Sequence, residues 1–180
     1  MPVIKSMSRK GSPNFRRIVN YILKEQQAKA WTLLHNMQAT YDDKEAIIQA
    51  FIQNDTYRKK RKNGNAYYHE ILSFSNLDYK AISSNIWVLE DLTQEYLTRR
   101  TDGIALAYPH IDDSTKSHPS IHVHILLSAN ELESSTSIRI SKAEFKRIKR
   151  AIEEIQAERY PEIAYSTIQK HLGKSRNRGR

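Results

Sequence analysis

The sequence predicts an α+β fold in which helices flank a central antiparallel β-sheet. Segments with helical spacing of apolar residues alternate with strand-like segments, and two strand-like segments are joined by a polar loop, as in an antiparallel hairpin. A chain of 180 residues is also long enough to bury a hydrophobic core. We expect one domain over residues 1–172, followed by a basic flexible tail over residues 173–180 that leads to further domains if the protein is longer.

The first elements are predicted from apolar periodicity. Residues 2–5 are expected to form a short strand and residues 8–12 a basic loop. A helix is predicted over residues 14–25, because apolar side chains recur there at helical spacing and Pro13 stands where helices often begin.

The next segment combines a short strand or turn, a helix and a basic loop. The strand or turn is expected over residues 31–36, and Asp42 or Asp43 can cap the helix that follows. Residues 58–62 are five consecutive basic residues beside a turn signal, so we expect them to form an exposed loop.

The second half of the chain contains most of the predicted sheet. Further strands are predicted over residues 66–74, 104–108, 121–127 and 137–140. A helix is predicted over residues 87–99. The last helix is expected to start at a capping box formed by Ser141 and Glu144 and to stop before Pro161.

Charge and composition narrow the function. The chain has 29 Lys and Arg against 20 Asp and Glu, so its formal net charge is +9 and a polyanion such as nucleic acid is the default partner. Cysteine is absent, which excludes disulfides, Cys-ligated zinc and a Cys nucleophile. No apolar run approaches the ~20 residues of a membrane span. No signal peptide is visible either, so we expect a cytoplasmic protein without membrane insertion.

The sharpest chemical signal is a pair of histidines in an apolar strand. His122 and His124 are two residues apart and therefore share one face, while Ile121, Val123 and Ile125 face the core. A lone pair of this kind is usually a polar strand face. Here four of the seven histidines lie between residues 110 and 124, which favours a divalent-metal site.

A metal site needs a third ligand. His110 ends the preceding strand and comes close to the pair if the two strands are antiparallel neighbours, and His118 in the loop is the second choice. Asp112 and Asp113 are candidates to orient a ligand imidazole, although a solvated turn is the ordinary role of such residues. A metal on a basic domain suggests phosphate-ester chemistry. The nucleophile is then water, Ser, Thr or one of the 10 tyrosines.

Three segments, in this order, resemble the motifs of conjugative relaxases of the P mobilisation class, which belong to the HUH endonuclease superfamily. Residues 14–26 (NFRRIVNYILKEQ) resemble the first motif, residues 68–75 (YHEILSFS) the second, and HID at 110–112 with IHVHI at 121–125 and Asn130 the third. The resemblance implies an HUH relaxase fold, with Tyr21 as the nucleophile and His110, His122 and His124 as metal ligands. Asp112 would then orient a ligand.

The resemblance also implies an activity and partners. A bacterial relaxase is a site- and strand-specific DNA endonuclease and strand transferase that nicks single-stranded DNA at the origin of transfer of a plasmid or mobile element. The reaction forms a 5′-phosphotyrosine and a free 3′-OH, and the strand is rejoined after transfer. The implied cofactor is a divalent cation, Mg²⁺ or Mn²⁺ before other transition metals. The implied partners are an origin hairpin with its nick site, accessory relaxosome proteins and a coupling protein.

Several side chains are candidate DNA contacts. Ser73 is expected to position the DNA, with Ser75 behind it, because the serine of the second motif has this role in the family. Phosphate contacts are expected from Arg16, Arg17 and Lys24, and salt-dependent affinity from residues 58–62. Trp31 and Tyr67 are candidates for stacking on bases, although packing is the commoner role of such aromatics.

Two other functions are kept as alternatives. Tyr165 with Gln169 resembles the YxxxQ arrangement of single-tyrosine HUH transposases, in which the tyrosine follows the histidine pair; a replication-initiator nuclease would use the same order. A non-catalytic module that binds single-stranded DNA, with structural or zinc-binding histidines, is the alternative from a different class. Metal-dependent cleavage separates this module from the enzymes.

Overall fold

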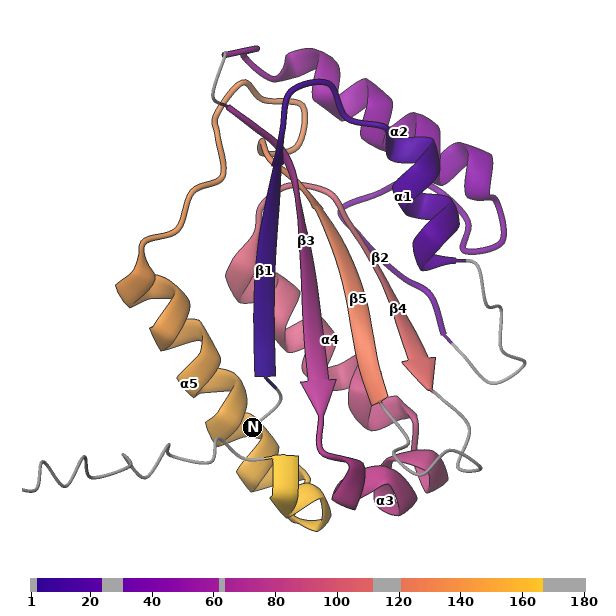
Figure 1. The fold of residues 1–180 in the computed structure, drawn as a ribbon, viewed down its shortest axis with the longest axis vertical. Coiled ribbons are helices and arrows are strands. Elements are labelled where there is room, and N and C mark those ends of the chain that lie inside the picture. The colour runs from indigo at the N-terminus through magenta and orange to yellow at the C-terminus, as the bar shows by residue number, and fades with distance from the viewer. Residues whose placement is uncertain (1–2, 24–30, 62–63, 112–120, 167–180) are drawn as a thin grey trace, which may run out of the picture.

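A computed structural model describes residues 3–23, 31–61, 64–111 and 121–166, which form an antiparallel sheet with helices on both faces (Figure 1). The strands are β1 (Val3–Lys10), β2 (Leu33–His35), β3 (Asn65–Phe74), β4 (Ala105–Ile111) and β5 (Ile121–Ser128). The helices are α1 (Phe15–Ile22), α2 (Lys44–Tyr57), α3 (Tyr79–Ser84), α4 (Trp87–Arg100) and α5 (Lys142–Arg159), with 3-10 helices η1 (Asn76–Asp78) and η2 (Pro161–Ser166). The five strands are ordered β1-β3-β5-β4-β2, and every neighbouring pair is antiparallel. The predicted α+β class is confirmed.

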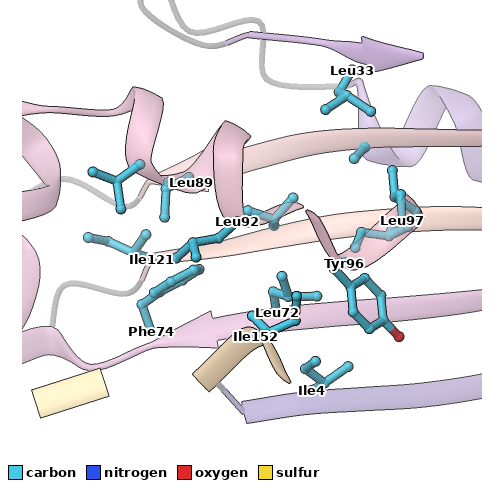
Figure 2. Close-up of a cluster of buried hydrophobic side chains, with 14 of the residues drawn as sticks. Ile4, Leu33, Leu72, Phe74, Leu89, Leu92, Tyr96, Leu97, Ile121 and Ile152 are labelled. Atoms are coloured by element: carbon cyan, nitrogen blue, oxygen red, sulfur yellow. The ribbon is translucent and has the colours of Figure 1, made fainter. Parts of the chain in front are cut away.

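The two faces of the sheet have separate hydrophobic cores. On one face, the side chains of Val123 and Ile125 on β5 belong to one buried cluster with residues of α4 and α5. Figure 2 shows two of these helix residues, Leu92 and Ile152. On the other face, α1 and α2 pack over a smaller cluster that includes Leu126 of β5. Because side chains alternate along a strand, His122 and His124 share the face of Leu126 and lie under α1.

Helix α1 is held in place by a cap and by its apolar stripe. The Asn14 side chain accepts a hydrogen bond of 2.9 Å from the Arg17 amide, which satisfies one free donor of the first turn. Phe15, Val19 and Ile22 are buried at helical spacing against the sheet. Tyr21 lies beside this stripe and remains 50% exposed.

Several predicted boundaries are confirmed. Asp43 caps α2 by accepting from the Ala46 amide at 2.9 Å, and Ser141 caps α5 by accepting from the Glu144 amide at 3.0 Å. The other half of the predicted capping box is missing, because the Glu144 carboxylate bonds to Arg147 instead. Among the described residues, no helix is long and apolar enough to cross a membrane.

Three local predictions are wrong. Residues 8–10, expected in a loop, continue β1, because Ser8 and Arg9 pair with the end of β3. The strand expected over residues 137–140 is reduced to one isolated bridge between Asn130 and Ser137. Arg58, expected in an exposed loop, is buried beside Asp55, with Nε 2.5 Å from Oδ1. The predicted tail lies outside the described residues.

A buried ionic network fastens β3 to α4 on the face away from the histidines. The fully buried Glu70 carboxylate accepts hydrogen bonds from Arg100 Nη2 at 2.9 Å, Ser6 Oγ at 2.7 Å and the Tyr96 hydroxyl at 2.5 Å. Burial raises the pKa of Tyr96, and the negative charge of Glu70 adds to this shift, so its phenol stays a hydrogen-bond donor. Strand β3 and helix α4 are therefore joined by an ion pair as well as by apolar packing.

We predict that Arg100→Met lowers the free energy of unfolding by about 3–5 kcal/mol, because it leaves a buried carboxylate without its cation. Chemical denaturation monitored by circular dichroism measures the loss. Arg147→Met is the matched control, because Arg147 also pairs with a glutamate but its side chain is 79% exposed. Equal losses in the two variants would contradict a special role of the buried pair.

Candidate active site

The pairing of β4 with β5 brings three of the predicted histidines together. His110 lies directly opposite His122, and His124 lies opposite Tyr108. One ring nitrogen from each of His110, His122 and His124 lies within 4.8 Å of the others. The ring centroids are 4.4 Å apart for His110 and His124 and 4.8 Å apart for His122 and His124. His118, the second choice as third ligand, lies outside the described residues.

Hydrogen bonds hold two of these imidazoles. His110 Nε2 is 2.8 Å from the Ile22 carbonyl oxygen, and since that oxygen can only accept, the imidazole donates. His124 Nδ1 is 2.9 Å from Nε2 of His69, a residue of β3. The first bond ties the cluster to the last residue of α1, next to Tyr21.

Burial keeps the His124 imidazole in the form that binds metal. Burial, with smaller contributions from the neighbouring His110, His122 and His69, lowers the pKa of His124 to about 3. Burial also lowers the pKa of His69, with a smaller contribution from the positive charge of Arg9. A neutral imidazole keeps a lone pair for a cation, so His124 can bind a metal without a competing proton, and the spacing of the three ring nitrogens fits one divalent ion.

The phenol of Tyr21 faces the histidines from α1. Its ring meets the His124 ring edge-on, with centroids 5.5 Å apart and planes at 81°. The His69 ring is contacted in the same manner at 6.1 Å and 83°. Half of the tyrosine remains exposed, so an incoming molecule can reach it.

A basic cavity of about 570 Å³ opens beside Tyr21 and His69. Cationic side chains of Arg9, Lys10 and Arg17 contribute to its wall. Tyr67 supplies an aromatic surface. A second cavity of about 430 Å³ shares Ser12 and Pro13 with it and continues toward Arg58, Lys60 and Arg61. The two cavities adjoin at Ser12 and Pro13, and together they are called the basic groove.

The other predicted DNA contacts are distributed unevenly. Ser73 lies opposite His122 in the β3–β5 register, so it shares the face of the histidines. Arg16 does not line the groove, and its Nη2 bonds to Glu45 Oε1 at 2.7 Å. Trp31 is buried in the core on the other face, which corrects the stacking alternative and leaves a packing role. Lys24, Asp112 and Asp113 lie outside the described residues.

Sequence reasoning missed His69, Arg9 and Lys10. Arg9 and Lys10 fell in the predicted loop, and their place in the groove depends on the extension of β1. His69 lies in the second motif, residues 68–75, but the sequence alone assigns it no role. The available signal was the period of two that puts Tyr67, His69 and Ser73 on one face of β3.

Tyr165, the alternative nucleophile, lies in a different part of the fold. It belongs to η2 and is 65% exposed, and its amide donates to Asp78 of η1 at 3.2 Å. The neighbouring Ile163 packs in the core of α4 and α5, on the opposite face of the sheet from the histidines. The structure does not bring Tyr165 to the cluster.

Two solved structures are similar in fold. One, described as the molecular basis of vancomycin resistance transfer in Staphylococcus aureus, has a TM-score of 0.55 at 13% identity, and the match covers 88% of this chain and 91% of that one. The other is the conjugative relaxase TrwC in complex with oriT DNA, in a metal-bound structure. Its TM-score is 0.52 at 10% identity, and the match covers 91% of this chain and 69% of that one. At these identities the likeness shows the fold alone.

No curated protein matches the sequence significantly. The profile of one protein family, described as relaxase, MobA/VirD2-like, nuclease domain, matches residues 21–160. This range contains Tyr21, the three clustered histidines and all but the first strand of the sheet. The chain therefore belongs to the relaxase family of MobA/VirD2-like nuclease domains.

Proposed function

We propose that this chain nicks and rejoins one DNA strand at the origin of transfer of a plasmid or mobile element, as a relaxase of the P mobilisation class. The observation that carries the proposal is the half-exposed phenol of Tyr21, which faces a cluster of three imidazoles at a ring distance of 5.5 Å from His124. The relaxase TrwC, similar in fold, is described with oriT DNA and a metal. A metal site and single-stranded DNA are accordingly part of the proposal here.

The proposed reaction exchanges one phosphodiester for another. The oxygen of Tyr21 attacks the scissile phosphorus, a new O–P bond forms, and the bond from phosphorus to the 3′-oxygen breaks. The 3′-oxygen takes up a proton, and the phenol has lost one, so the atoms balance. The 5′-phosphotyrosine keeps the energy of the broken bond. The reverse attack by a 3′-OH therefore rejoins the strand without another energy source.

His110, His122 and His124 would hold the divalent cation. When bound, a cation polarises a phosphoryl oxygen and neutralises the charge that develops during displacement. We propose Mg²⁺ or Mn²⁺. The described donors are three imidazoles, which also suit zinc, nickel or copper. Asp112 is kept as the proposed orienting carboxylate, and accessory relaxosome proteins and a coupling protein remain predicted partners.

The groove beside Tyr21 gives the DNA a path to the reacting atoms. Phosphates would contact Arg9, Lys10 and Arg17, and a base would stack on Tyr67 at the groove wall. Ser73, on the histidine face of β3, keeps its proposed positioning role. Arg16 is a weaker candidate than Arg17, because its guanidinium is already paired with Glu45.

We predict that Tyr21→Phe lowers covalent adduct formation by on the order of 10³-fold or more, because phenylalanine has no oxygen to attack phosphorus. The substrate is an oligonucleotide from the origin of the element that encodes this chain, with Mn²⁺ present. Its label is at the 3′ end, because the segment that begins at the 5′-phosphate stays on the protein. Denaturing gels detect the adduct.

Tyr165→Phe is the matched control for this experiment, since it removes the same atom from the exposed tyrosine of η2. It should form the adduct as the unmodified chain does. Loss of the adduct in Tyr165→Phe alone would refute the assignment of Tyr21. Binding without cleavage by every variant, including the unmodified chain, would favour the non-catalytic module.

We predict that Mn²⁺ at about 100 times its Kd raises the free energy of unfolding by about 2.7 kcal/mol, because the cation binds only the folded cluster. His122→Gln should lose most of this gain, and a chelator should reverse it. His35→Gln is the control, because His35 lies on β2, away from the cluster, and contacts the Thr101 carbonyl oxygen after α4. Denaturation with and without metal measures the difference, and a gain that survives in His122→Gln would contradict the proposed site.

We predict that Arg17→Gln weakens binding of single-stranded DNA and reduces the slope of log affinity against log salt by about 0.7, the value for one phosphate contact. Fluorescence anisotropy at several salt concentrations measures both. The control is Arg150→Gln, which removes the same charge from α5 on the other face of the sheet. If both variants change the slope equally, net charge rather than the groove determines affinity.

A further inference from the structure

His69 contacts the proposed metal site without being one of its three clustered histidines. Its Nε2 is 2.9 Å from His124 Nδ1, and the two rings are nearly parallel, with planes at 23° and centroids 5.1 Å apart. Its ring also receives the edge of Tyr21 at 6.1 Å. His69 therefore contacts both the proposed nucleophile and a proposed ligand.

The sheet register explains this position. On β3, Ile71 lies opposite His124 and His69 lies opposite Leu126, so His69 and His124 are diagonal neighbours on one face. Long side chains at such positions reach one another. The contact between His69 and His124 is thus a consequence of how β3 pairs with β5.

Only one direction of the hydrogen bond is compatible with a metal at His124. A neutral imidazole carries one proton, on either Nδ1 or Nε2. If His69 donates to Nδ1 of His124, the proton of His124 must be on Nε2, and neither nitrogen has a lone pair left for a cation. If His124 donates through Nδ1–H, its Nε2 keeps the lone pair.

We propose that His69 is a positioning residue: its Nε2 accepts from His124 Nδ1–H and so makes His124 present Nε2 to the cation. This inference rests on the proposed function, because it takes His124 as a ligand. His110 follows the same rule with a different partner, since its Nε2–H donates to the Ile22 carbonyl and leaves Nδ1 with the lone pair. Ligand imidazoles in proteins usually have such an outer partner, which fixes their tautomer and orientation.

The choice of an imidazole as the partner has an electrostatic consequence. A carboxylate at this place would add a negative charge close to a site that must receive a phosphodiester. His69 supplies an acceptor without that charge.

The first test measures Mn²⁺ affinity of the full chain by isothermal titration calorimetry. His69→Leu removes the acceptor and should weaken binding by about 10- to 100-fold. His69→Gln has a side-chain oxygen of similar reach, and its affinity should remain within about threefold of the unmodified chain. His35→Leu, which removes a part-buried imidazole far from the cluster, should have no effect on affinity.

The second test reads the tautomer of His124 directly. Long-range ¹H–¹⁵N spectra of the metal-free chain distinguish Nδ1–H from Nε2–H imidazoles, and His124→Gln identifies the signals. We expect His124 to carry its proton on Nδ1 in the unmodified chain and in His69→Gln. In His69→Leu the proton should move to Nε2. A purely structural role of His69 would not produce this change.

The outcomes separate this inference from the proposed function. If the unmodified chain does not bind Mn²⁺, both fail. If it binds Mn²⁺ and His122→Gln does not, the metal site stands. In that case an unchanged affinity in His69→Leu, an equal loss in His69→Leu and His69→Gln, or an Nε2–H tautomer of His124 in the unmodified chain overturns the role of His69 alone.

Discussion

The register between β4 and β5 is the constraint on which the site depends. It places His110 opposite His122 and Tyr108 opposite His124, so that three imidazoles share one face. A shift of one residue would turn the histidines of β5 toward α4 and bring Val123 and Ile125 under α1. The apolar side chains prevent it, since Val123, Ile125 and Ala107 are fully buried in the core of α4 and α5. The hydrophobic pattern that folds the sheet therefore also assembles the histidine cluster.

Strand β3 connects the cluster to the rest of the domain through two consecutive residues. His69 faces the cluster and bonds to His124, whereas Glu70 faces the other side and bonds to Arg100 of α4. A buried ion pair costs desolvation free energy for both partners, and the hydrogen bonds from Arg100 Nε and Nη2 to Glu70 fix the position of the strand. Because β3 is held in this way, His69 has a defined place from which to orient His124. The ionic network and the histidine contacts thus lie on opposite faces of the same strand, β3.

The sequence predicts the local features of this fold and site better than its long-range pairings. Alternation along β5 is enough to place His122 and His124 on one face, and helical spacing is enough to leave Tyr21 outside the apolar stripe of α1. The role of His69 depends on the pairing of β3 with β5, which no local pattern contains. The pairing of Arg16 with Glu45 of α2 is likewise a tertiary contact. The segment 137–140 has side chains suited to a strand, but within the described part of the chain it makes only the bridge from Ser137 to Asn130 and forms no ladder.

Helix α1, which carries the proposed nucleophile, is joined to a proposed metal ligand by a hydrogen bond. The Ile22 carbonyl, which accepts from His110, belongs to the residue after Tyr21 at the end of an eight-residue helix. Such a short helix derives little stability from its own hydrogen bonds, so its place depends on the burial of Phe15, Val19 and Ile22 and on this contact. A displacement of α1 would move the phenol and release the outer nitrogen of His110 together. In the proposed reaction the phenol must be in line with the scissile bond both when the strand is cut and when it is rejoined. A direct link between the proposed nucleophile and a proposed ligand serves that requirement, because both groups then keep the same relative position in both directions of the reaction.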